Sequence, residues 1–116
     1  MTIQRFHGGA AGRARATRYN GLVYTVATDS TNAATIADQT RNTLATLDKN
    51  LAEAGSDKTR IIQATVYLAD MSNKAAMDEV WCAWIGPKEN WPQRACVGAN
   101  LPGANMVEIV IVAAAK

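Results

Sequence analysis

Histidine is almost absent from this chain, and the absence excludes several kinds of active site. The only histidine is His7, near the N-terminus. A Ser-His-Asp or Cys-His relay would have to use that one residue, and no Gly-x-Ser-x-Gly elbow is present to carry a nucleophile. Metal sites built on histidine are disfavoured for the same reason. We therefore expect neither a histidine relay nor a metal ion.

Cysteine is scarce as well, and the glycines form no recognised nucleotide loop. Cys82 and Cys96 are the only two cysteines and make no Cys-x-x-Cys pair, which argues against a disulfide framework and a zinc site. The stretch HGGAAGR lacks the G-x-G-x-x-G and G-K-[ST] patterns. The sequence predicts reduced thiols and no cofactor.

Long apolar runs and a strong net charge are also missing. No run approaches the ~20 apolar residues that a membrane span needs, so we expect a cytoplasmic protein with no membrane partner. The net charge of +2 does not indicate a nucleic-acid partner. Arg13, Arg15 and Arg18 cluster and could neutralise phosphates, but such a run is more typical of a solvated surface.

The pattern that is present predicts one α+β domain over residues 1–116. Residues 1–17 show no period and are expected to form an irregular arm. Asn20-Gly21 predicts a hairpin turn ahead of a strand that begins at Leu22. The predicted element order is ββ-α-β-α-ββ, with one mixed sheet carrying both helices on a single face.

Two segments have helical periodicity. The first, over 32–54, is expected to begin at Thr31 or Asn32 and to stop at Gly55. Its buried stripe comprises Ile36, Thr40, Leu44, Leu47 and Leu51. The second is expected to be capped by Ser72 and ended by Gly86-Pro87. Its apolar face comprises Met77, Val80, Trp81, Trp84 and Ile85.

Three later segments show the alternation of apolar and polar residues, or the apolar runs, that are typical of strands. In the first of them, one face is predicted to carry Ile62, Ala64, Val66 and Leu68. The other two are expected over 93–100 and 106–114. The last strand is apolar on both faces, which predicts that a second copy of the chain covers the face without helices.

Two ionic residues stand in these last strands, where unpaired charges are rarely buried. Arg94 presents a planar fork that suits a carboxylate, and Glu108 could accept or donate a proton. If the two strands form a hairpin centred on Gly103, the two charges lie ~13 Å apart. That spacing leaves room for a small acid and a water, or else each residue meets a group from a neighbouring subunit. A structural ion pair or a solvated rim position remains the alternative.

The same region resembles a known family. The stretch WPQRACVGANLPGANMVEIVIVAA is similar to the closing signature of the RidA (YjgF) family, an aromatic-Pro-x-Arg-x-Cys-Val run followed by Leu-Pro and Val-Glu-Ile. The segment TRNTLATLDKNLAEAGSDKTRIIQATVYLADMSNKAAMDEVWCAWI resembles the family's two helices and the strand between them. The resemblance runs from about Leu22 to the C-terminus.

The resemblance implies a chorismate-mutase-like fold, assembled as a homotrimeric barrel with pockets at subunit interfaces. Family members with the arginine hydrolyse reactive 2-imino and enamine acids, such as 2-iminobutanoate and 2-iminopropanoate, to 2-oxo acids and ammonia without a cofactor. Carried over to this chain, Arg94 binds the substrate carboxylate, Cys96 and Trp91 contact the ligand, and Glu108 positions the attacking water.

Departures from the family pattern mark a divergent subgroup. The Gly-Pro-Tyr motif is absent, and YTVATDS places Val26, Ala27 and Thr28 where the family has Ser-Gly-Gln. Arg13, Arg15 and the arginines near them could then shape the pocket entrance. Two other functions stay open: a non-catalytic trimer that binds small carboxylates or proteins, and an RNA-directed inhibitor of translation.

Overall fold

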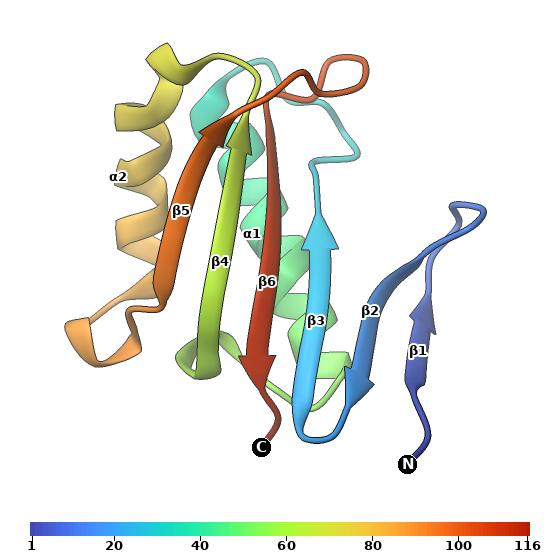
Figure 1. The fold of residues 1–116 in the computed structure, drawn as a ribbon. Coiled ribbons are helices and arrows are strands. Elements are labelled where there is room, and N and C mark those ends of the chain that lie inside the picture. The colour runs from blue at the N-terminus through green and yellow to red at the C-terminus, as the bar shows by residue number, and fades with distance from the viewer.

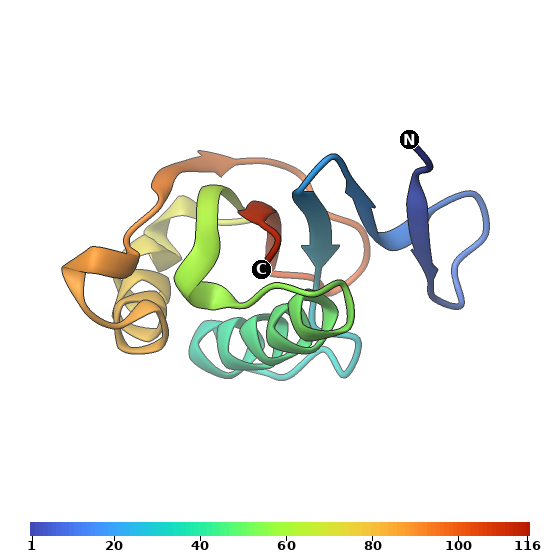
Figure 2. The same ribbon diagram turned by 90° about the horizontal axis from the view of Figure 1, so that it is seen from below.

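The protein consists of one six-stranded sheet with two helices on a single face (Figures 1 and 2). The computed structural model describes all residues, 1–116. The strand order is β1-β2-β3-β6-β4-β5, and every neighbouring pair is antiparallel except β4 and β5. The elements are β1 Gln4–His7, β2 Ala14–Tyr19, β3 Leu22–Ala27, α1 Ile36–Glu53, β4 Ile61–Leu68, α2 Lys74–Ile85, β5 Gln93–Gly98 and β6 Val107–Ala114. The predicted α+β architecture is confirmed.

The N-terminal segment differs from the prediction of an irregular arm over 1–17. It holds β1 and most of β2, which pair with each other. β1 is a short edge strand in which only Phe6 packs against the core, so it needs no apolar alternation and the sequence shows none. The predicted turn at Asn20-Gly21 is confirmed, because both residues have positive φ (52° and 78°) and join β2 to β3.

Both helices begin later than predicted. α1 is capped by Thr35, whose hydroxyl accepts a hydrogen bond from the N–H of Asp38. The expected cap residues Thr31 and Asn32 lie instead in a turn that the carboxylate of Asp29 organises, by accepting the N–H groups of residues 31 and 33. The predicted stop at Gly55 is confirmed, with φ at 85°.

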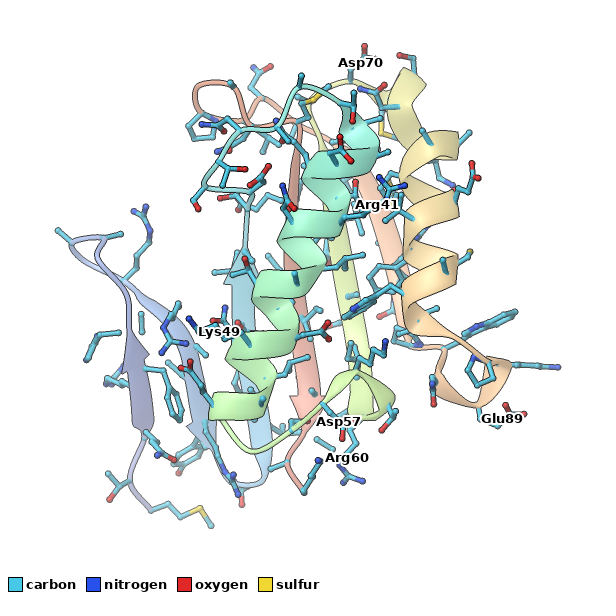
Figure 3. All side chains as sticks on the ribbon, turned by 180° about the vertical axis from the view of Figure 1, so that it is seen from behind. Arg41, Lys49, Asp57, Arg60, Asp70 and Glu89 are labelled. Carbon is cyan, nitrogen blue, oxygen red and sulfur yellow. The ribbon has the colours of Figure 1, made fainter.

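α2 begins at Lys74 rather than beside Ser72. Asp70, labelled in Figure 3 near the start of α2, accepts the N–H of Ser72 and so caps a short 3-10 turn that precedes the helix. The predicted helix end at Gly86 is confirmed, with φ at 79°. Met77, Trp81 and Ile85 of α2 are buried against the sheet, as their spacing predicts.

β4 contains a bulge that the alternation did not reveal. The register with β6 shifts between Ile61 and Gln63. Ile61 is therefore buried, while Ile62, predicted to face the core, is 49% exposed. The rest of the predicted inner face of β4 is confirmed, with Ala64, Val66 and Leu68 fully buried.

The last two strands do not form the expected hairpin. β4 lies between β5 and β6, antiparallel to β6 and parallel to β5. The reason is the α2 crossover: a strand, a helix and a following strand on one sheet form a parallel unit. The loop after β5 then crosses over the end of β4, so that β6 pairs with the edge of β4 opposite to β5 (Figure 1).

The hydrophobic core lies between the helices and the sheet, whereas the opposite face of the sheet carries no helix (Figure 2). We call that opposite face the open face. Tyr24, Val97 and Val110 lie on it and are 44%, 43% and 36% exposed. Neither helix combines the length and the hydropathy that crossing a membrane would require.

Candidate functional site

Arg94 lies on the edge strand β5 and points toward α2, on the helix side of the sheet. Its Nη2 donates to Oδ1 of Asp78 at 2.6 Å, and its guanidinium lies over the ring of Trp81, 5.3 Å from the centroid. The side chain is 19% exposed. A guanidinium has five N–H donors. Nη2 contacts Asp78 and Nη1 contacts Sδ of Met77 at 3.9 Å, so the remaining N–H groups are free for a second carboxylate.

Asp78 is a functional candidate that the sequence did not reveal. Its second oxygen accepts from Nζ of Lys74 at 2.6 Å. Burial opposes ionisation of Asp78, but the hydrogen bonds from Lys74 and Arg94 and the attraction of both cations outweigh it and lower its pKa. Asp78 therefore stays a carboxylate at neutral pH and fixes the orientation of the Arg94 guanidinium.

Cys96 follows Arg94 on the same side of β5, beside Val66 of β4. Its side chain is half-buried. Burial raises the pKa of the Cys96 thiol, and the Arg94 cation offsets that effect only in part. Cys96 is thus a neutral thiol at physiological pH, suited to lining a pocket rather than to nucleophilic attack.

Alkylation should distinguish the two cysteines. At pH 8, iodoacetamide is expected to modify the exposed Cys82 at least ~10-fold faster than Cys96, because only the thiolate reacts. Since the pKa of Cys96 is raised, its rate should still be climbing above pH 9. Peptide mass spectrometry over a time course measures both rates. Equal rates at pH 8 would contradict this description of Cys96.

Glu108 lies on the open face, near the start of β6. It pairs with Tyr67 of β4, while its neighbours Val107 and Ile109 face the core. Glu108 lines a cavity of about 630 Å³. The β1–β2 loop, the end of β3 and the β5–β6 loop form its walls, at one end of the sheet (Figure 1). We call it the Glu108 cavity; it is lined by Gly8, Gly9, Ala10, Arg13, Ala14, Arg15, Val26, Ala27, Thr28, Pro102, Asn105 and Glu108.

Within one chain, Arg94 and Glu108 do not face each other, so the predicted hairpin geometry is wrong. They lie on opposite faces of the sheet, with β4 between their strands. Neither Arg94 nor Cys96 lines the Glu108 cavity. The alternative of a structural ion pair between the two is wrong as well, because Arg94 pairs with Asp78. Within one chain, the two charges therefore belong to two different surfaces.

Trp91 lies apart from the Glu108 cavity, on the loop between α2 and β5 that also carries the labelled Glu89 (Figure 3). Its indole Nε1 donates to the carbonyl of Gly86 at 3.0 Å. The residue is nonetheless 62% exposed. Its predicted role in substrate binding stays a prediction, and in this chain the ring faces outward next to the edge strand β5.

Two of the three clustered arginines form ion pairs or hydrogen bonds with α1 and its C-terminal cap residue. Arg15 forms an ion pair with Glu53 and donates to Oδ1 of Asn50 at 3.0 Å. Arg18 donates to the carbonyl of Ala54 at 3.0 Å. Arg13 belongs to none of the five ion pairs. The cluster is therefore not a continuous free basic patch, and both Arg13 and Arg15 line the Glu108 cavity.

Comparison with known proteins assigns the family. The model of the family described as Endoribonuclease L-PSP matches residues 10–115. A RutC family protein from Haemophilus ducreyi is 44% identical over 100 residues, which is 83% of each chain. The RutC family protein YoaB from Escherichia coli is 39% identical over 98% of this chain and 99% of its own. A crystal structure of a YjgF family member from Neisseria meningitidis superposes with a TM-score of 0.93 at 39% identity, covering 100% of this chain and 97% of that one. The chain therefore belongs to the RidA (YjgF) family.

Proposed function

We propose that this protein hydrolyses reactive 2-imino and enamine acids to 2-oxo acids and ammonia, at sites formed between copies of the chain. The observation that carries the proposal is the division of the site. An oriented guanidinium with free donors lies on an edge strand, and a carboxylate without an ion-pair partner lines a cavity on the other face. A neighbouring copy can supply the half that each surface lacks.

The open face supports this assembly. Tyr24, Val97 and Val110 leave apolar area exposed there, and covering it contributes favourable free energy. Because the two half-sites differ, their contact is head to tail, and a ring that closes is the stable form of such a contact. The family resemblance favours a ring of three copies.

The proposed chemistry needs only water as a co-reactant. Arg94 holds the substrate carboxylate with parallel N–H donors, and Asp78 keeps the guanidinium in place. Glu108 of the next copy accepts a proton from water as its oxygen bonds to the imine carbon. That proton passes to the nitrogen and gives a carbinolamine. Glu108 then moves the hydroxyl proton to the nitrogen, the C–N bond breaks, and ammonia leaves as the C=O bond forms. An enamine first gains a proton at carbon and loses one from nitrogen, which converts it to the imine.

An imine generated in the assay tests the proposal. An amino acid oxidase releases 2-imino acids from alanine, leucine and norvaline in turn, and semicarbazide traps whatever imine remains. We expect the wild-type protein to suppress semicarbazone formation, because it hydrolyses the imine first. Glu108→Gln is isosteric but a poor base, so it should lose at least ~100-fold in rate. No suppression with any precursor would reject the catalytic proposal.

The same protein could bind small carboxylates without turning them over. In that case a 2-oxo acid would still raise the melting temperature of the wild type, and Glu108→Gln would bind as well as the wild type. Binding without suppression of the semicarbazone would favour this second candidate over catalysis.

RNA cleavage is the function that the description of the matching family model favours. Against it stands the engagement of Arg15 and Arg18 with α1, which leaves only Arg13 of the cluster free to contact phosphates. Phosphate contacts release counterions, so a true RNA-binding surface weakens steeply with salt. RNA cleavage that increases with enzyme and is lost in Arg13→Gln would support this candidate.

A further inference from the structure

We propose that Arg13 forms a second anion site in the Glu108 cavity, so that the preferred substrates are 2-imino acids whose side chain carries another carboxylate. The inference rests on the proposed function, in which Arg94 of a neighbouring copy binds the first carboxylate. It concerns the part of the site where the family's Gly-Pro-Tyr and Ser-Gly-Gln motifs are missing, and it names the substrate class.

Arg13 is a free cation on the wall of this cavity. It lies on the loop between β1 and β2, lines the same cavity as Glu108, and has no ion-pair partner within 4.0 Å. Arg15, two residues along the chain, is held by Glu53 and Asn50. Of the two arginines that line the cavity, Arg13 is thus the one with its donors available.

The loop leaves space in front of this cation. Gly9 lines the cavity, and a Cβ added at either Gly9 or Gly12 would meet no atom within 4 Å. Gly12 has φ at 82°, a conformation that L side chains rarely adopt, and it sets the backbone immediately before Arg13. Arg13 is itself exposed, and the loop that carries it has little side-chain bulk at Gly9 and Gly12.

The rest of the cavity suits a short carbon chain between two anionic ends. Val26, Ala27 and Pro102 contribute apolar wall. The cavity volume of about 630 Å³ lies within the ~300–1,000 Å³ usual for small-molecule pockets. A substrate of three or four carbons would leave part of this cavity empty. A dicarboxylic imino acid would place its reacting carbon near Glu108 and its second carboxylate at Arg13.

The chemistry favours a carboxylate over a phosphate. One guanidinium fork matches one carboxylate through two parallel hydrogen bonds. Glu108 in the same cavity repels an anion, and it repels a dianionic phosphate more strongly than a carboxylate. Nucleic acid would need a row of free cations, whereas Arg15 and Arg18 are committed to α1.

A pair of product-like ligands tests the inference by binding alone. 2-Oxoglutarate and 2-oxopentanoate have the same chain length and differ only in the second carboxylate. By calorimetry, the wild type is expected to bind 2-oxoglutarate at least ~10-fold more tightly, the value of one good charge-assisted contact. Arg13→Gln should remove that preference and leave the affinity for 2-oxopentanoate unchanged.

Arg5→Gln is the matched control, because Arg5 is an exposed arginine of the same N-terminal hairpin that does not line the cavity. It should bind both ligands as the wild type does. Equal affinities in the wild type, or a loss in Arg13→Gln that is the same for both ligands, would overturn the inference. Inorganic phosphate binding more tightly than 2-oxoglutarate would overturn the choice of a carboxylate.

Rates of imine hydrolysis test this inference and the proposed function separately. Imines released from glutamate and norvaline should give a preference for the former that Arg13→Gln abolishes. If neither imine is hydrolysed faster than in buffer, the proposed function fails, and the binding preference still decides the second anion site. If both are hydrolysed equally well by wild type and Arg13→Gln, the proposed function stands and the inference fails.

Discussion

Replacing Arg94 with alanine is expected to lower kcat/KM for imine hydrolysis by at least ~100-fold. The substrate would lose two charge-assisted hydrogen bonds, together worth about 3 kcal/mol. The fold should survive, because Asp78 keeps its contact with Lys74 and remains partly exposed. Steady-state kinetics with the semicarbazide trap measure the loss, and circular dichroism checks that the protein is folded.

Two further variants make the Arg94 result specific. Arg94→Lys keeps the charge but not the planar fork, so its activity should fall between wild type and alanine. Arg41→Ala removes an exposed arginine of α1 that also pairs with an aspartate, and it should retain full activity (Figure 3). If Arg94→Ala kept more than half of the wild-type rate, Arg94 would not bind the substrate carboxylate.

Val110→Lys is expected to convert the assembly to monomers and to abolish activity with it. Val110 lies on β6 in the open face, opposite Val26 of β3 and Thr65 of β4. In one chain it is 36% exposed, so a lysine there is tolerated by the fold. Inside an interface between copies, an unpaired ammonium costs several kcal/mol. Activity should disappear as well, because each proposed site needs two copies.

Light scattering after gel filtration measures this outcome. The wild type should have about three times the 12.4 kDa mass of the chain, and Val110→Lys should have the mass of one chain. Ala52→Lys places the same charge on the exposed surface of α1 and should leave both mass and activity unchanged. A Val110→Lys variant that stays assembled would show that the open face is not the contact between copies.

The parts of the fold that could be predicted from sequence are those set by local chemistry. Asn20-Gly21 requires positive φ at two successive residues, which identifies the hairpin between β2 and β3. The stripe of Leu44, Leu47 and Leu51 is buried as its spacing indicates, because one face of α1 must cover the sheet. Gly55 and Gly86 end the two helices for the conformational reason that predicts them.

The parts that could not be predicted depend on neighbours distant in sequence. β1 has one core residue, Phe6, and is a strand only because β2 lies beside it. The exposed Ile62 results from a bulge against β6 that no pattern within β4 indicates. The separation of β5 from β6 could have been predicted from the sequence, because a strand, a helix and a following strand on one sheet form a parallel pair, here β4 and β5.

In the candidate site, too, the residues that their own strands mark could be predicted, whereas the contacts between distant segments could not. Arg94 and Glu108 attract notice because they interrupt apolar strands, and the proposed roles come from the family resemblance. Asp78 escapes notice because its spacing from Lys74 is typical of a solvated ion pair on a helix. Its contact with Arg94 exists only because α2 packs beside β5. That Arg94 and Glu108 lie on opposite faces follows from how β5 and β6 each pair with β4, because Ala64 lies opposite Arg94 whereas Tyr67 lies opposite Glu108.

Mixing two inactive variants tests most directly whether each site is shared between copies. Arg94→Ala and Glu108→Gln are unfolded together in equal amounts, refolded, and assayed for imine hydrolysis. If the guanidinium and the carboxylate come from different copies, random assembly restores about a quarter of the sites. Native mass spectrometry confirms that mixed assemblies have formed. Mixed assemblies with no activity above that of the separate variants would contradict a site built from two chains.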